Sequence, residues 1–174
     1  FIFGVYSPSG GGGIFLMIVT TILMILISLL IATPIGILAA VYLHEYAKQG
    51  RLVSIIRYAT ESLTGIPSII YGLFGAVFFV AILKLGMSII AASLTLTIIV
   101  LPVIIRTTEE ALKTVPTTYR EGSLALGTTK LQTLLKVILP SAMPGILSGI
   151  ILSIGRIVGE SAAIFLTAGT VAAM

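Results

Sequence analysis

The sequence predicts an all-α, polytopic membrane protein. Hydrophobic residues make up 57% of the chain, charged residues only 9%, and the mean hydropathy is +1.20, whereas roughly a quarter of the residues of a soluble domain are charged. The apolar residues form long runs, and most Lys and Arg residues lie between the runs or at their ends. This pattern is typical of helices that cross a bilayer. We therefore expect one transmembrane domain over residues 1–174.

The lengths of the apolar runs predict about four spans. The first run has about 30 residues without a charge, more than the roughly 20 that cross a hydrocarbon core. Only residues 84–86 separate the second run from the third, so these two should form an antiparallel hairpin. The expected spans are residues 14–43, 66–83, 87–105 and 141–166.

Residues 1–13 are expected to form a loop at the membrane surface. Their glycine run lacks the Lys-Ser/Thr pair of a phosphate-binding loop. The chain begins without methionine and stops without a polar tail. We therefore expect a fragment that is truncated at both ends.

Small residues in the spans predict close helix packing, because packing drives helix association in lipid. The last expected span holds two Gly-x-x-x-Gly pairs, Gly145 with Gly149 and Gly155 with Gly159. Gly72 belongs to a similar row of small residues in the second span.

The basic residues predict the orientation. Residues 44–65 and 106–136 hold three and five Lys or Arg residues, whereas the link at 84–86 holds one. The positive-inside rule places the first two segments in the cytoplasm. The loop over residues 106–140, and its polar part 116–140 in particular, should therefore face the cytoplasm of a multi-pass protein of the cell membrane.

The cytoplasmic loop carries signals for two helices joined by a bend. Thr118 with Glu121, and Thr129 with Gln132, have the spacing of capping boxes, in which each side chain accepts a backbone N–H of the first turn. Gly127 lies between them, where a left-handed residue would end the first helix. We expect a helix over 118–126, a turn at Gly127, and a second helix that runs to Pro140.

Two charges lie deep in the last expected span. An arginine at a helix centre costs about 2.5–3.5 kcal/mol on insertion, so it usually faces a partner or an aqueous path. Arg156 and Glu160 are four residues apart, which would place them on one helix face. They are either a structural ion pair or part of a pathway in which Arg156 offers its donor fork to an oxyanion.

Arg106 closes the third expected span. It is either an interfacial anchor or part of the inner mouth of a pathway. Glu61 and Arg57, also four residues apart, should form a surface pair.

Several other classes of function are disfavoured. The chain has no cysteine and one histidine, His44, so that no metal site is predicted. The net charge of +4 is not gathered into a basic stripe, which argues against a nucleic-acid partner. Neither a Walker motif nor a protease or esterase motif is present. We expect no enzyme and no cofactor of its own.

The loop resembles the EAA loop of type I ABC importer permeases, the binding-protein-dependent family. Glu121, Gly122, Ser123, then Gly127, and finally the segment Val137-Ile138-Leu139-Pro140 are similar to Glu-Ala-Ala-x3-Gly-x9-Ile-x-Leu-Pro. In that family this short helix is a coupling helix that docks on a separate ATPase subunit. The resemblance implies that ATP is bound by the partner subunit. The residues that it assigns to coupling are Tyr119, Arg120, Glu121, Gly122, Ser123, Ala125 and Gly127. A cytoplasmic amphipathic loop without a partner is the alternative.

Three further stretches are similar to the phosphate branch of these permeases, the PstA type. They are GIPSIIYGLFG from Gly65, LPVIIRTTEEAL from Leu101 and GRIVGESAAIFLTAG from Gly155. The resemblance implies a MetI-like helical core, a second related, PstC-like permease, two ATPase subunits and an extracytoplasmic phosphate-binding protein. It also assigns Arg156, Glu160 and Arg106 to charged positions of the family. A permease for another oxyanion, such as molybdate or sulfate, and an ATP-independent secondary transporter remain the alternatives.

Overall fold

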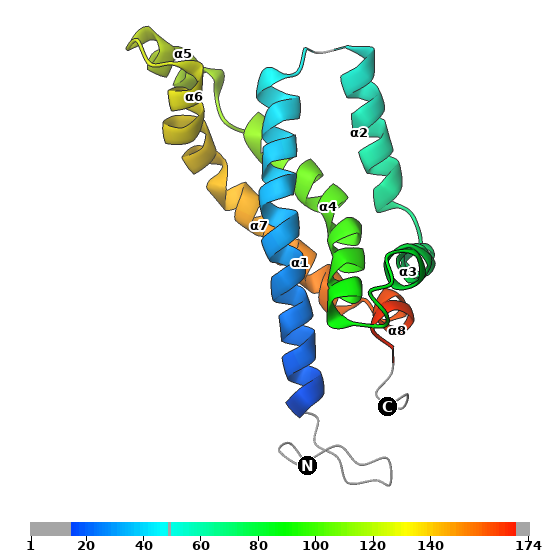
Figure 1. Ribbon diagram of the computed structural model, residues 1–174. Coiled ribbons are helices and arrows are strands. Elements are labelled where there is room, and N and C mark those ends of the chain that lie inside the picture. The colour runs from blue at the N-terminus through cyan, green and yellow to red at the C-terminus, as the bar shows by residue number, and fades with distance from the viewer. Residues whose placement is uncertain (1–14, 49, 170–174) are drawn as a thin grey trace, which may run out of the picture. The chain divides into compact units, whose positions relative to one another are not determined.

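The computed structural model describes residues 15–48 and 50–169, and its regular elements are helical (Figure 1). This confirms the predicted all-α class. The loop expected over residues 1–13 lies outside the described residues. In chain order the helices are α1 Phe15–Val41, η1 Tyr42–Tyr46, α2 Arg51–Thr64, α3 Ser68–Gly75, η2 Ala76–Ile82, α4 Ile89–Lys113, α5 Thr117–Ala125, α6 Lys130–Thr133, η3 Leu134–Ile138, α7 Leu139–Val158 and α8 Ala162–Ala168, where η marks a π-helix.

The helices are grouped into two compact units. The first unit takes the chain as far as Ile31, then Ile66–Val100, and then the chain from Ile154 onward. The second takes Ala32–Gly65 and Leu101–Ser153. Helices α1, α4 and α7 each contribute residues to both units.

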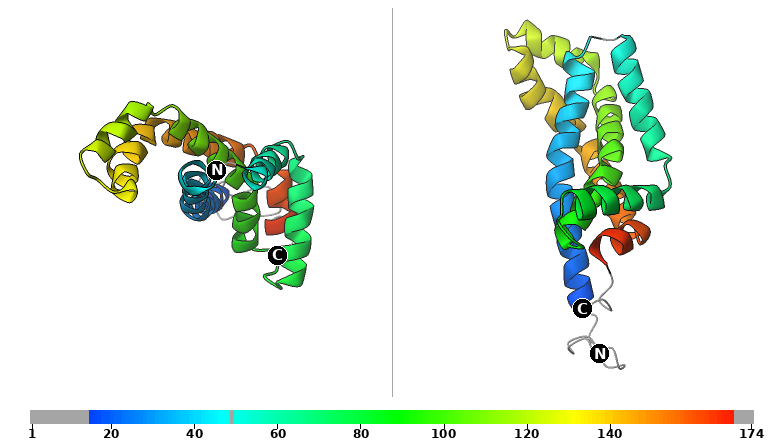
Figure 2. Two further views of the ribbon diagram at one scale, coloured as in Figure 1. Left: turned by 90° about the horizontal axis from the view of Figure 1, so that it is seen from above. Right: turned by 45° about the vertical axis from the view of Figure 1, so that its right-hand side comes forward.

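The first unit is held together by a close approach of α3 to α8, which lie side by side in both views of Figure 2. A Cβ at Gly72 would come 2.9 Å from the Cα of Ala163. A Cβ at Gly75 would overlap the side chain of Thr95 on α4. Glycine therefore lets these helix backbones approach each other, as the row of small residues around Gly72 predicts.

The antiparallel hairpin expected at residues 84–86 is wrong. In Figure 1, α3 is seen end-on, whereas the first half of α4 runs along the page. The link that joins η2 to α4 contains two residues in the left-handed region, Lys84 with φ 54° and Gly86 with φ 65°. The backbone N–H of Ser88 then donates to the carbonyl of Thr167 at 3.2 Å. With these constraints, α3 and η2 cross α4 instead of lying antiparallel to it.

The second unit has a continuous apolar core where α1, α4, η3 and α7 meet. Gly145 and Gly149 of α7 face α4: a Cβ at Gly145 would lie 2.6 Å from the Cβ of Ala111, and one at Gly149 would overlap the side chain of Thr107. The first Gly-x-x-x-Gly pair therefore packs as predicted. The core residues are Val41, Ala111, Leu112, Leu134, Ile138, Ala142 and Ile146.

The helix boundaries correct two expected spans. Helix α7 ends at Val158, and Gly159 to Ser161 separate it from α8, so the last apolar helix does not continue through residue 166. Gly159 is a poor helix former, and nothing lies within 4 Å of a Cβ built on Gly155. Within the described residues, the second Gly-x-x-x-Gly pair therefore brings no two helices together.

The second correction concerns the start of the span expected over residues 66–83, which contains Pro67. Proline disfavours a helical conformation in the residue before it, and α3 begins only at Ser68. Among residues 15–48 and 50–169, three helices are long and apolar enough to cross a membrane, namely Met17–Tyr46, Ile89–Lys113 and Lys130–Val158. In this part of the chain, a fourth span is reached if Arg51–Thr64 and Ser68–Ile82 count together as one broken span.

Pro140 does not end the helix that precedes it, contrary to expectation. The helical run continues from Lys130 to Val158. A proline ring clashes with the carbonyl four residues earlier and donates no hydrogen bond. The π-helix η3, Leu134–Ile138, lies directly before it, and its wider i→i+5 turns make room for the ring.

Helix α2 turns its polar face toward α4 and its apolar face outward. Leu52, Ile55, Ile56 and Leu63 are all exposed, and their spacing places them on one side of the helix. Arg57, on the other side, contacts Glu109. An apolar face of this width is unstable in water, so we expect it to contact lipid acyl chains.

Tryptophan fluorescence tests this expectation, because the 174 residues contain no tryptophan. Brominated lipid should quench the additional fluorescence of a Leu52→Trp variant of the full-length protein. The matched control is Leu126→Trp in the polar loop, where the native side chain is equally open, with 86% exposed against 77% for Leu52. Equal quenching of the two variants would contradict lipid contact by α2.

Candidate functional site

The polar loop folds as a helical elbow, in which α5 and α6 meet at a tight turn (Figure 1). Helix α5 occupies residues 117–125 where a helix was expected over 118–126. Gly127 has φ 82°, and its N–H donates to the carbonyl of Leu124 at 2.9 Å. The predicted left-handed turn is therefore confirmed. A Cβ at Gly127 would meet nothing within 4 Å, so its backbone conformation alone favours glycine.

One of the two predicted capping boxes is present. The N–H of Thr129 donates to Oε1 of Gln132 at 3.0 Å, and the N–H of Gln132 donates to Oγ1 of Thr129 at 3.3 Å. The box predicted for Thr118 and Glu121 is wrong. Helix α5 begins at Thr117, after the extended residue Pro116, so Thr118 lies inside the first turn and cannot cap it.

Three hydroxyl groups close the inner side of the elbow. Oγ of Ser123 lies 2.8 Å from Oγ1 of Thr128 and 3.0 Å from Oγ1 of Thr133, and the two threonine oxygens are 2.8 Å apart. Thr128 also donates to the carbonyl of Ser123. Ser123 and Thr133 are buried. The hydroxyl cluster ties α5 to α6, so the two helices should move as one body.

The outer side of the elbow is exposed. Tyr119, Glu121, Gly122 and Ala125 are exposed. The side chain of Leu126 is 86% exposed at the turn. Exposed aromatic and aliphatic groups beside a carboxylate on a short helix are typical of a protein-binding surface.

Arg120 points inward instead. Its Nη2 forms a short ion pair with Oε1 of Glu45, which belongs to the π-helix η1 at the end of α1. The Glu45 side chain is only 13% exposed, and His44 lies 3.7 Å from the same oxygen. A cavity of about 150 Å³ lies beside the pair, and Tyr46, Leu124 and Lys130 also line it.

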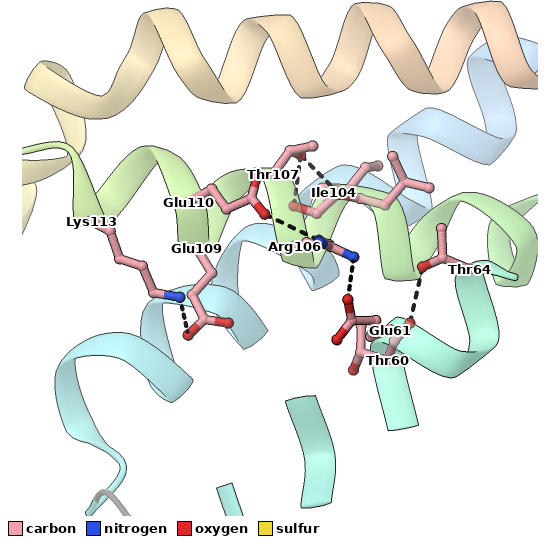
Figure 3. A network of polar contacts seen from close by, with 10 residues as sticks. Thr60, Glu61, Thr64, Ile104, Arg106, Thr107, Glu109, Glu110 and Lys113 are labelled. Carbon is pink, nitrogen blue, oxygen red and sulfur yellow. Dashed lines mark hydrogen bonds and ion pairs between the residues drawn. The ribbon is translucent and has the colours of Figure 1, made fainter. Parts of the chain in front are cut away.

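Arg106 forms ion pairs with two carboxylates (Figure 3). Its Nη1 lies 3.0 Å from Oε1 of Glu61 on α2, and its Nε lies 3.1 Å from Oε1 of Glu110 on α4. These two partners offset the guanidinium charge. The contacts therefore favour the anchoring role of Arg106 over a role in binding an anion.

A second ion-pair group lies on the same side of α4. Nη2 of Arg57 is 2.6 Å from Oε1 of Glu109, and Nζ of Lys113 is 3.6 Å from that oxygen. The side chain of Glu109 is only 7% exposed. Arg57 and Glu61 both reach across to α4, which corrects the pair expected within α2. A cavity of about 180 Å³ lies between the two groups.

Arg156 and Glu160 do not share a helix face, contrary to expectation. Arg156 lies in the last turn of α7, which ends at Val158. Glu160 follows in the break before α8 and is 9% exposed, and its N–H donates to the carbonyl of Ile157. Among the ion pairs of the described residues, none joins the two. Arg156 instead lies within electrostatic range of the buried phenol of Tyr71 on α3.

Sequence reasoning missed Glu45 and Glu109. Glu45 meets a residue 75 positions away, and no local spacing predicts such a pair. Glu109 is part of the Thr-Thr-Glu-Glu run, but only the contact between α2 and α4 distinguishes it from Glu110. The one sequence signal was the position of Glu45, directly after an uncharged run of about 30 residues. A carboxylate at such a position usually has a charged partner.

The comparisons with known proteins decide the family. The family model of the binding-protein-dependent transport system inner membrane component matches residues 32–173. The chain belongs to this family. It is thus a multi-pass protein of the plasma membrane, and the resemblance of the EAA-like loop agrees with this family.

Several members of this transport family are similar to the chain. It is 40% identical over 161 residues to the probable ABC transporter permease protein YqgI of Bacillus subtilis, with 92% of this chain and 55% of YqgI covered. It is 41% identical over 143 residues to the phosphate transport system permease protein PstA 1 of Mycobacterium tuberculosis, with 82% and 47% covered. The chain thus spans about half the length of these relatives.

Solved structures show the same fold. An inward-facing crystal form of the MetNI methionine ABC transporter matches with a TM-score of 0.69 and 28% identity, over 87% of this chain and 70% of that one. A second inward-facing form of MetNI gives 0.66 and 27%, over 84% and 68%. The predicted type I importer core is therefore confirmed.

Proposed function

We propose that this chain forms the translocation pathway of an ATP-driven phosphate importer. The observation that carries the proposal is the 41% identity to a phosphate transport system permease over 143 residues. The position of Arg156 supports it, because a guanidinium offers a tetrahedral oxyanion two parallel hydrogen bonds. In this proposal, phosphate binds the guanidinium of Arg156 as it passes this residue.

The elbow would receive the energy of ATP hydrolysis. The chain would hold no ATPase site and no cofactor, and α5 would dock on a separate ATPase subunit through the exposed side of Tyr119, Glu121 and Ala125. A PstC-like second permease and an extracytoplasmic phosphate-binding protein would complete the importer. The rigid joint formed by Gly127 and the hydroxyl cluster supports this part of the proposal, because a loose loop would not pass on a displacement.

Competition between oxyanions tests the substrate. The full-length protein would be reconstituted with the partner permease, the ATPase and the binding protein, and uptake of labelled phosphate measured against excess sulfate or molybdate. We expect neither to compete. Competition by either anion would assign the permease to that oxyanion instead.

A pair of glycine variants tests the coupling role of the elbow. Gly127→Ala should strain the left-handed turn by about 1 kcal/mol and lower phosphate uptake per ATP hydrolysed. Gly155→Ala is the matched control, since a Cβ at either position meets nothing within 4 Å and Gly155 is helical and outside the elbow. The measurement is the ratio of uptake to hydrolysis in proteoliposomes. Equal ratios for the two variants would remove the Gly127 turn from the coupling mechanism.

A further inference from the structure

A long-range ion pair joins α5 to η1, the π-helix that follows α1. Arg120 lies on the coupling helix, one residue before Glu121 of the EAA-like motif. Its guanidinium pairs with Glu45, which is 75 residues earlier in the chain and lies at the cytoplasmic end of α1. An interaction over this separation joins two elements that local structure does not connect.

The environment of the pair makes it more than a surface contact. The side chain of Glu45 is 13% exposed and that of Arg120 is 35% exposed. Exposed ion pairs contribute little to stability, whereas removing one partner of a shielded pair leaves an uncompensated charge. The cavity of about 150 Å³ beside the pair is lined by η1, α5, α6 and η3, so α5 is not packed tightly against η1 at this point. The ion pair bridges a gap that side-chain packing leaves open.

The end of α1 is also a point where a helix can change its hydrogen bonding. Residues 42–46 form a π-helix, and the N–H of Ala47 donates to the carbonyl of Tyr42 at 2.8 Å. Such i→i+5 turns are weaker than α-helical turns and are common at functional sites. Val41, directly before this segment, belongs to the apolar core that also contains Leu134 and Ile138. Glu45 therefore lies on a compliant segment next to a rigid core.

We propose that Glu45 and Arg120 are positioning residues that transmit the displacement of the coupling helix to α1. The ion pair acts as a strut: when the partner ATPase moves α5, Arg120 moves Glu45, and the π-helix η1 allows the end of α1 to follow. This inference rests on the proposed function, because it requires that α5 receives a displacement. Beyond that function, the inference states that a movement of α5 is passed to α1 through a single ion pair.

The first test compares charge variants in the reconstituted full-length importer. Glu45→Gln and Arg120→Gln should each lower phosphate uptake per ATP hydrolysed by about tenfold, with hydrolysis continuing. The double exchange Glu45→Arg with Arg120→Glu should recover most of the ratio, which a merely structural role of either residue would not produce. Lys130→Gln is the matched control, since it removes a cation from the same cavity and leaves the pair intact. Normal ratios in both single variants, or a double exchange no better than the single variants, would overturn the strut.

The second test does not depend on phosphate. The chain contains no cysteine, so spin labels can be placed at Tyr42→Cys and Leu126→Cys, two exposed positions on η1 and at the end of α5. With native Glu45, the label-to-label distance should be the same with and without trapped ATP, because the two elements move together. In the Glu45→Gln background it should shift or broaden on ATP trapping. An unchanged distance in that background would contradict the strut, even if uptake proved to be of another oxyanion.

Discussion

Replacing Gly149 by leucine should leave little folded protein. A Cβ at this position would overlap Oγ1 of Thr107, and that hydroxyl is held by the carbonyls of Val103 and Ile104 at 2.9 and 3.3 Å. Overpacking a tight contact costs about 1–3 kcal/mol and occasionally more, and here the added side chain separates α4 from α7. The melting temperature in detergent and the monodisperse fraction should both fall.

Gly155→Leu is the control for the Gly149 variant. It adds the same side chain to the same helix, but a Cβ at Gly155 meets nothing within 4 Å, so its melting temperature should stay near that of the native protein. Removing the opposing Cβ in the double variant Gly149→Ala with Thr107→Gly should be better tolerated than Gly149→Ala alone. Equal melting temperatures for Gly149→Leu and Gly155→Leu would contradict the close contact of α4 and α7.

Arg156→Ala should reduce phosphate uptake to the background level while the importer still assembles. The guanidinium belongs to the last turn of α7, and alanine offers no donor to an oxyanion. Arg156→Lys keeps the charge but lacks the planar fork, so its uptake should be intermediate. Uptake and the yield of the purified complex are measured together.

The control for Arg156 is Lys84→Ala, which removes a cation from the exposed link between η2 and α4. It should leave both uptake and assembly unchanged. If Arg156→Ala lost the assembled complex, Arg156 would have a structural role. If it retained full uptake, phosphate would not pass this residue.

Local signals in the sequence predicted the elbow well. Gly127 and the Thr129–Gln132 box act over a few residues, and their geometry follows from backbone conformation and from hydrogen bonds to neighbouring N–H groups. The close packing at the first Gly-x-x-x-Gly pair could be predicted for a similar reason, because small residues at helical spacing permit close approach whichever helix lies opposite. The family followed from the full spacing from Glu121 to Pro140.

Features that depend on distant parts of the chain could not be predicted. The partner of Arg120 depends on where the fold places α5 relative to η1, and the partner of Arg57 on where it places α2 relative to α4. Pro140 is tolerated because η3 widens the helix before it, which apolar periodicity does not reveal. The break after Val158 was missed because residues 155–166 are apolar enough to resemble a continuous span.

The most direct test of the account is the ATP dependence of phosphate uptake. Proteoliposomes would hold the full-length protein with its partner permease and the ATPase, and would be supplied with the binding protein and labelled phosphate, with and without ATP inside. The account predicts uptake only when ATP is present and hydrolysed. Uptake at the same rate without ATP would contradict it, since the elbow would then be an ordinary cytoplasmic loop and the protein a secondary transporter.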